Sequence, residues 1–281
     1  MNYYKDKSVD ENITAISSKS GEILYLIEGT TGAVLIDTCI GIGHLKDYIK
    51  TIRKTDTPLT VLLSHGHIDH AMGAPEFEKC FLNPKDIPLY KSQCSIKERR
   101  GYAAMGIGKE AEALPDSEFV PETPDYKFCP LSDGMKFDLG GITVEALAAP
   151  GHTKGCMAFL IPEKEILITG DACNNSTFLF DDVCDSVAEY KKSMESLREK
   201  TKGRYKRVFL MHHIMDAPVD LLDQMINLCN EILNQTECNT LDNVPFSFMG
   251  KQAVIAKQAN ERMERADGQF ANLIYNPGRI F

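Results

Sequence analysis

Ser64-His65-Gly66-His67-Ile68-Asp69-His70 is the stretch that decides how this chain of 281 residues folds and what it can bind. It sets three histidines and one aspartate in the pattern H-x-H-x-D-H. Neutral imidazole and carboxylate are the ligands that suit zinc, iron and manganese. The run before it, residues 59–63, is apolar and β-branched, which indicates a strand. The stretch therefore predicts a metal site at the end of a strand.

The residues around this stretch predict a sheet with helices. Residues 21–27 and 33–37 are apolar runs separated by Gly29 and Gly32, a pattern that predicts two strands joined by a turn. Apolar residues recur at helical spacing over 44–54, which predicts an amphipathic helix. Residues 91–130 mix glycines, prolines and apolar positions, and we interpret them as a helical insertion with loops.

A second β-rich block follows, and the chain then becomes helical in pattern. We expect strands over 142–148, 157–161, 165–169 and 207–211, a helix over 187–200, and further helices over 219–233 and 251–265. These expectations divide the chain into one domain over residues 1–218, with the insertion at about 91–130, and a C-terminal helical extension over 219–281 packed on the same domain.

Four candidate ligands each come just past the C-terminal end of a predicted strand. They are His65, His152, Asp171 and His212. That edge is where strand-end loops carry chemistry in α/β architectures, so residues far apart in sequence can converge there. Two metal ions ~3.5–4 Å apart can share a hydroxide if a carboxylate bridges them, and Asp171 is our choice for the bridge.

With these motifs in place, the chain resembles the metallo-β-lactamase superfamily of hydrolases over about residues 20–218. The resemblance implies an α+β fold, the αββα four-layer sandwich of two mixed β-sheets flanked by helices. It rests on the stretch quoted first and on three later motifs in the same order. These are Pro150-Gly151-His152-Thr153-Lys154-Gly155, Thr169-Gly170-Asp171 and Phe209-Leu210-Met211-His212.

The resemblance also implies a ligand set for two divalent metal ions. His65, His67 and His152 would hold the first ion. Asp69, His70 and His212 would hold the second, with Asp171 as the bridge. Asp37 looks like the buried acid that orders the ligand loop in this family. Zinc is our first expectation for the metals, and the ligand set also admits iron and manganese.

Some assignments stay open at this point. His212 and His213 both follow the last strand, and strand register favours His212 as the ligand. Asp69 and His213 are our candidates for catalytic residues. Candidates for substrate contact are Lys154, Tyr102, Met105, Phe178 and Phe180. We interpret Cys156 and Cys173 as packing residues and His44 as a surface residue.

Composition limits the cellular location and the partners that we expect. The chain is 43% hydrophobic and 25% charged, which is typical of a globular protein, and its apolar runs are shorter than the ~20 residues that cross a bilayer. Nine cysteines and a polar start without an export signal predict reduced thiols and a cytoplasmic location. A formal net charge of -9 disfavours nucleic acid as a partner.

These features favour a dinuclear metallohydrolase that attacks an ester, thioester, lactone or phosphodiester bond of a small molecule. One alternative is a mononuclear iron oxidoreductase similar to the persulfide dioxygenases, which use two histidines and one carboxylate of the same framework. The other is a metal-binding protein of the same fold without catalysis. We expect a small-molecule substrate, no membrane partner, and an oligomeric state that the sequence leaves open, with a homodimer compatible.

Overall fold

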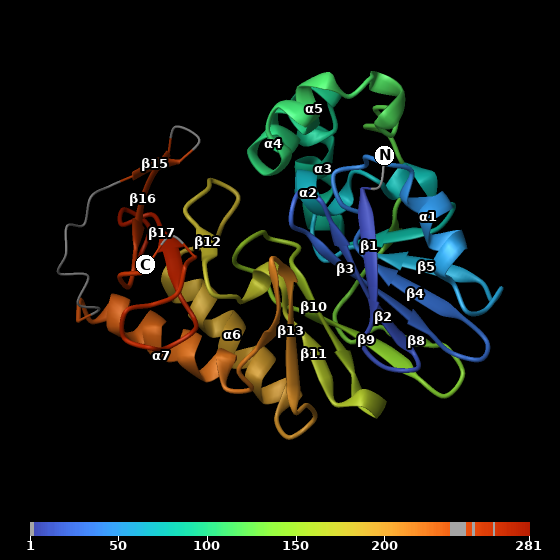
Figure 1. Cartoon of the computed structure of the whole chain (residues 1–281). Helices are drawn as coiled ribbons and strands as arrows, with labels where there is room; N and C mark the ends of the chain where they lie inside the picture. The colour runs from blue at the N-terminus through green and yellow to red at the C-terminus, as the bar shows by residue number, and fades with distance from the viewer. Residues whose placement is uncertain (1–2, 237–245, 249–250, 261) are drawn as a thin grey trace. The chain divides into compact units, whose positions relative to one another are not determined.

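The computed structural model describes residues 3–236, 246–248, 251–260 and 262–281 (Figure 1). The chain divides into two compact units. Unit 1 comprises Met1–Ala146 and Met211–Met215, and unit 2 comprises Leu147–Leu210 and Asp216–Phe281. Within the described ranges, no helix has both the length and the apolar character that a membrane span requires.

Unit 1 is built on a seven-stranded mixed sheet, drawn mainly in blue in Figure 1. The strands lie side by side in chain order: β1 (Tyr4–Ser8), β2 (Ile13–Ser18), β3 (Ile23–Glu28), β4 (Ala33–Ile36), β5 (Leu59–Leu62), β6 (Cys80–Leu82) and β7 (Cys129–Pro130). Neighbours are antiparallel from β1 to β4 and parallel from β4 to β7. The strand pair and the strand predicted before the ligand stretch are therefore confirmed as β3, β4 and β5.

Helices follow the parallel strands of unit 1. They are α1 (Leu45–Ile52), α2 (Ile68–Ala71), α3 (Ile87–Gln93), α4 (Ile96–Ile107) and α5 (Lys109–Ala113), with short 3-10 turns at Ala74–Glu76, Pro84–Asp86 and Asp116–Glu118. Leu45 and Ile49 of α1 are buried in one cluster with strand residues such as Leu35. The helix predicted over 44–54 is confirmed, and α4 and α5 supply helices within the range 91–130, whose status as an insertion stays a prediction. A hairpin of β8 (Lys136–Asp138) and β9 (Thr143–Ala148) follows.

Unit 2 combines short strands with two longer helices. Its strands are β10 (Met157–Ile161), β11 (Ile166–Ile168), β12 (Thr177–Leu179), β13 (Arg207–His212), β15 (Phe246–Phe248), β16 (Lys251–Ile255) and β17 (Leu273–Tyr275), and its helices are α6 (Val187–Thr201) and α7 (Leu221–Leu233). β10 and β11 are antiparallel, and β11 and β13 are parallel. The last residues of β13 and the first of β14 (Ile214–Ala217) belong to unit 1.

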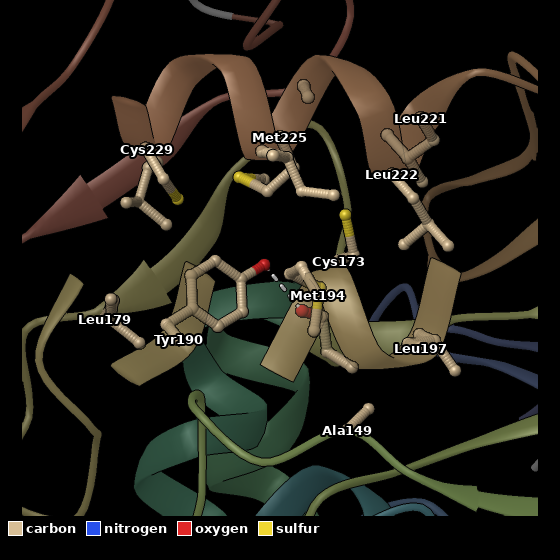
Figure 2. Close-up of a cluster of buried hydrophobic side chains, with 14 of the residues drawn as sticks. Ala149, Cys173, Leu179, Tyr190, Met194, Leu197, Leu221, Leu222, Met225 and Cys229 are labelled. Carbon is tan, nitrogen blue, oxygen red and sulfur yellow. Dashed lines mark hydrogen bonds between the residues drawn. The ribbon is translucent and has the colours of Figure 1, made fainter. Parts of the chain in front are cut away.

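Helices α6 and α7 both contribute side chains to the core of unit 2 (Figure 2). Tyr190, Met194 and Leu197 come from α6, and Leu222 and Met225 come from α7; each is at most 1% exposed. Cys156 and Cys173 belong to the same cluster, which supports the interpretation that both pack in the core. The eight cysteines that the structure describes are free cysteines.

One predicted element is wrong. The helix expected over 251–265 is absent from the described residues of that range, which instead begin with strand β16. β16 pairs antiparallel with β17, and β17 pairs parallel with β12. Pairing with a neighbouring strand outweighs weak helical spacing where β-branched residues such as Val254 and Ile255 are present. Among the described residues the extension is therefore α-helical only over α7, and the domain boundary at residue 218 stays a prediction.

Candidate metal centre

The ligand stretch follows the end of β5. Hydrogen bonds anchor its backbone at alternate residues. Each anchor is a backbone N–H that donates to a side-chain oxygen from another element. The bonds run from Ser64 N to Asp37 Oδ1 (2.6 Å), from Gly66 N to Asp86 Oδ2 (3.0 Å) and from Ile68 N to Gln93 Oε1 (2.8 Å). The intervening residues carry the predicted ligand side chains, so the anchors fix the segment that presents them.

Parallel pairing explains why Asp37 reaches this loop. Ile36 lies opposite Leu62 in the β4–β5 register, so both strands end at one edge of the sheet. The N–H of Asp37 extends the pairing by donating to the Leu62 carbonyl at 2.9 Å. Asp37 then adopts a left-handed backbone conformation with φ 64°, which aspartate tolerates better than most residues. The chain thereby turns the carboxylate toward the ligand loop.

The Asp37 carboxylate determines the tautomer of two imidazoles. Its Oδ2 accepts from Ser64 Oγ and from His70 Nδ1, both at 2.6 Å. The Ser64 hydroxyl uses its one hydrogen to donate to Asp37. Its oxygen therefore acts as the acceptor in the hydrogen bond with His65 Nδ1, at 2.9 Å. Both histidines therefore carry their proton on Nδ1 and keep a lone pair on Nε2, the form that binds a metal ion. The ordering role predicted for Asp37 fits this geometry.

The imidazole rings of the candidate ligands in unit 1 lie close together. The ring centroid of His65 lies 4.1 Å from that of His70 and 4.8 Å from that of His67. Nε2 of His70 lies 3.0 Å from Nε2 of His212. Asp69 Oδ2 lies 3.6 Å and 3.4 Å from these two nitrogens. His65, Asp69 and His70 are buried.

This donor set fits a divalent cation. Ligand atoms of Asp69, His70 and His212 lie within 4.8 Å of one another, and those of His65 and His67 do too. A carboxylate and several imidazole lone pairs converge in a buried region, where unbalanced negative charge is costly. A bound cation removes that cost, so unit 1 alone presents residues suited to hold metal.

Unit 2 carries the two other predicted ligands, His152 and Asp171. His152 Nδ1 donates to the carbonyl of Phe178 at 2.7 Å, so its lone pair is again on Nε2. That nitrogen lies 3.8 Å from Asp171 Oδ2. The carbonyl of His152 accepts from the Cys184 thiol at 3.1 Å. Burial raises the pKa of this thiol to about 12, which keeps its proton in place.

Tyr190 of α6 contacts both turns that carry these ligands. Gly151, just before His152, has φ 147°, and a Cβ placed on it would lie 2.2 Å from Tyr190 Cδ2. The Tyr190 hydroxyl donates to the carbonyl of Ala172, just after Asp171, at 2.7 Å, and Figure 2 marks this bond. Burial raises the pKa of Tyr190 well above its usual value, so the hydroxyl stays a donor.

A family model described as the metallo-beta-lactamase superfamily matches residues 24–212. The chain belongs to this superfamily. A solved structure of a metallo-beta-lactamase from Pontibacter korlensis is similar in fold, with a TM-score of 0.57 and 16% sequence identity over 80% of this chain and 97% of that one. These matches confirm the predicted fold class, in which mixed sheets are flanked by helices.

Several superfamily relatives are similar in sequence over about half of this chain. An uncharacterized protein of Mycobacterium tuberculosis is 32% identical over 157 residues, covering 50% of this chain and 62% of the relative. Hydroxyacylglutathione hydrolase GloC of Haemophilus influenzae is 32% identical over 136 residues, covering 46% and 57%. Atrochrysone carboxyl ACP thioesterase nsrC of Aspergillus novofumigatus is 29% identical over 155 residues, covering 54% and 38%. Each match spans less than two thirds of the relative's length.

The two adjacent histidines at the end of β13, His212 and His213, differ in their surroundings. His212 faces Asp69 and His70, and it belongs to a group of candidate ligands that does not include His213. His213 is exposed, with φ 51°, and its N–H donates to the Gly21 carbonyl at 2.8 Å. Its ring lies against Gly21. This geometry favours His212 as the superfamily's last ligand, and a catalytic role for His213 stays a prediction.

The predicted substrate residues have different environments. The Tyr102 hydroxyl donates to Asp69 Oδ2 at 2.5 Å, whereas Met105 is 58% exposed on the same helix. Lys154 forms an ion pair with Asp185. Substrate contact by Tyr102, Met105 and Lys154 stays a prediction.

Phe178 and Phe180 belong to the small hydrophobic cluster next to β12. Phe178 is partly buried and supplies the carbonyl that orients His152. Phe180 is 4% exposed and packs with Ala253 and Ile274, and substrate contact by Phe178 and Phe180 stays a prediction. His44 is exposed at the start of α1, as expected for a surface residue.

Three residues that support the ligands were not found by sequence reasoning. Asp86 and Gln93 anchor the ligand loop, and Tyr190 contacts both ligand turns of unit 2. Asp86 and Gln93 look like ordinary polar residues, and Tyr190 looks like an ordinary apolar position of a helix. The one signal available was Gly151, since a glycine beside a ligand often marks a close approach of other atoms.

Proposed function

We propose that this protein is a metal-dependent hydrolase that cleaves the thioester bond of a small acyl compound. The observation that carries the proposal is the cluster of His65, His67, Asp69, His70 and His212, in which His65, Asp69 and His70 are buried and two imidazoles are held in the metal-binding tautomer. Superfamily membership makes hydrolysis the expected chemistry for such a cluster.

The order of the superfamily motifs supports a full ligand set. In this proposal His65, His67 and His152 would hold one ion, Asp69, His70 and His212 would hold a second, and Asp171 would be a ligand shared by both. The presence of both sets favours two ions over the single iron of a dioxygenase. Zinc suits the imidazole and carboxylate donors best, and iron and manganese are the alternatives. When bound, such ions lower the pKa of coordinated water and polarise the carbonyl under attack.

The residues of the chain have separate roles in this proposal. Asp37 holds the imidazoles of His65 and His70 in orientation, so that no reorganisation is needed when the acyl group is attacked. Asp69 is the catalytic residue we propose beyond its role as a ligand, because a buried carboxylate beside two imidazoles can hold a proton during turnover. A role for His213 in proton transfer is retained as a prediction.

The relatives support the choice of bond. One is named a thioesterase and another a hydroxyacylglutathione hydrolase, and glutathione carries acyl groups on its sulfur. Oxygen esters, lactones and phosphodiesters are the other bonds that the same chemistry can cleave. A small-molecule substrate, a cytoplasmic location, a homodimer and the lack of a nucleic-acid or membrane partner stay predictions.

The test is metal content and turnover of the purified protein. We expect two bound equivalents of metal, hydrolysis of an acylglutathione thioester, and loss of both after chelation. His65→Ala should lower kcat/KM by more than the ~10–100-fold that follows loss of a ligand's supporting partner. His44→Ala is the matched control, because His44 is exposed in the same unit and should leave activity unchanged.

Two results would replace this proposal by an alternative. One tightly bound iron with oxygen consumption on a thiol persulfide would identify the dioxygenase. Two bound metals without turnover of a thioester, oxygen ester, lactone or phosphodiester would identify a metal-binding protein that lacks catalysis.

A further inference from the structure

Helix α4 of the insertion reaches the metal ligands through one hydroxyl group. The Tyr102 hydroxyl donates to Asp69 Oδ2 at 2.5 Å, within the range of a charge-assisted O–H···O bond. Asp69 lies in α2, so the bond joins two elements that are separate in sequence. We propose that Tyr102 is a positioning residue that holds the Asp69 carboxylate for the metal ion that Asp69, His70 and His212 bind. The inference rests on the proposed metal site.

The helix that carries Tyr102 is firmly fixed within unit 1. Arg99 lies one turn earlier on the same face of α4 and is 1% exposed. Its guanidinium donates to the carbonyl of Val120 at 2.5 Å and lies 5.7 Å from the ring of Phe119. A Cβ on Gly41 would lie 3.0 Å from the same guanidinium. These contacts leave α4 little freedom, so the Tyr102 hydroxyl is held at a defined position.

The start of α4 is fixed as well. The Ser95 side chain accepts from the N–H of Glu98, and the Ser95 hydroxyl donates to the Glu98 carboxylate at 3.1 Å. This arrangement satisfies donors that the first turn of a helix otherwise leaves without intrahelical partners. The contacts that hold α4, and with it Tyr102, therefore form without a bound substrate.

The oxygen that Tyr102 contacts is the one that faces the ligands. Asp69 Oδ2 is also 3.4 Å from His212 Nε2 and 3.6 Å from His70 Nε2. An aspartate side chain can rotate about two bonds, and a hydrogen bond from a fixed helix restricts that rotation. Tyr102 thereby keeps Oδ2 directed at the two imidazoles. Loss of the hydroxyl should weaken metal binding at these three residues and leave the other metal site unchanged.

The test compares two tyrosines that each donate to an aspartate. Tyr102→Phe removes only the hydroxyl that reaches Asp69. Tyr48→Phe removes a hydroxyl that donates to Asp6 Oδ1 at 2.7 Å, away from the ligands, and is the matched control. Zinc binding is measured by competition with a chromophoric chelator, and the ligand field is followed by the visible spectrum after cobalt(II) substitution. Unfolding midpoints of the metal-free variants show whether each one folds.

We expect Tyr102→Phe to weaken one of the two zinc equivalents ~10–100-fold, to change the cobalt spectrum, and to leave the other equivalent as in the wild type. Tyr48→Phe should match the wild type in all three measurements. Two zinc equivalents of unchanged affinity in Tyr102→Phe would overturn the inference and leave the proposed function standing. A raised KM for the thioester with unchanged zinc affinity would also overturn it, since Tyr102 would then be a substrate contact. Lack of binding of zinc, iron and manganese by the wild type would overturn both.

Discussion

The candidate ligands of unit 1 and those of unit 2 are held in place by different means. In unit 1 the ligand loop is held by side-chain hydrogen bonds, above all those of Asp37 with Ser64 and His70. In unit 2 His152 is oriented by a backbone carbonyl, and the turns beside His152 and Asp171 are held by the Tyr190 ring and hydroxyl. Hydrogen bonds select a histidine tautomer in both units, but in unit 2 close packing also sets the path of the chain.

The difference predicts different responses to substitution. A buried carboxylate that accepts several bonds leaves several donors without partners when it is removed, and that loss is large. A glycine packed against an aromatic ring resists any added atom, because interiors are close-packed and cannot absorb it. Four substitutions test these expectations, in decreasing order of effect.

Asp37→Ala should have the largest effect. Asp37 is 1% exposed and accepts from Ser64 N, Ser64 Oγ and His70 Nδ1, so its removal should cost about 3–5 kcal/mol of the free energy of unfolding. Metal binding should fall as well, because His65 and His70 lose their fixed tautomer. Denaturant unfolding with metal analysis measures both. Asp37→Asn keeps the side-chain size and should lose less stability than Asp37→Ala; an equal loss would contradict the role of hydrogen bonding.

Gly151→Ala should come next. The added Cβ would meet the Tyr190 ring at a backbone φ of 147°, so overpacking and strain together should cost about 2–4 kcal/mol. Gly203→Ala is the matched control, because Gly203 has φ 71° with nothing within 4 Å of the added atom. Thermal unfolding of both variants separates strain from the clash. Equal destabilisation would show that Tyr190 does not restrict the turn before His152.

Tyr190→Phe should have a smaller effect on stability. It leaves the buried carbonyl of Ala172 without the Tyr190 hydroxyl, a loss of about 1–2 kcal/mol. Tyr126→Phe is the control in unit 1, since its hydroxyl donates to the Phe77 carbonyl at 2.7 Å. Both variants should unfold earlier in denaturant, and only Tyr190→Phe should also weaken metal binding. Similar metal binding in the two variants would limit Tyr190 to a purely structural role.

His213→Ala should have the smallest effect. An exposed side chain contributes less than about 0.5 kcal/mol to stability, and His213 lies outside both groups of candidate ligands. We expect His213→Ala to keep two metal equivalents and His212→Ala to keep one, as measured by elemental analysis. The reverse result would exchange the two histidines in the ligand set.

Much of the fold near the site follows from local sequence patterns. The apolar runs of β4 and β5 are short, so the sequence predicts where these strands lie. Parallel pairing of the two strands then places Asp37 beside the ligand loop. The helix over 251–265 was wrong because strand pairing with β17, which lies almost twenty residues away, decides the conformation there. Local spacing carries no information on such a partner.

The candidate ligands were more predictable than the residues that support them. His65, His70 and the other ligands must be of a type that binds metal, so residue identity reveals them. Gln93 needs only an oxygen within reach of the Ile68 N–H, and Tyr190 needs only to fill the space beside Gly151. Many residue types satisfy such needs, so the supporting role of Gln93 or Tyr190 cannot be predicted from the residue type. The same holds for Phe180, because an aromatic ring suits a pocket and a core equally well.

Asp37 has a consequence for how this protein could lose or change a metal. Through one oxygen it orients His70 directly and His65 by way of Ser64. In the proposed ligand set these two histidines serve different ions, so the coordination of both ions shares a single support. A substitution at Asp37 therefore impairs both metal-binding positions together. A variant of this protein that binds one metal ion is expected to arise by substitution of a ligand and not of Asp37.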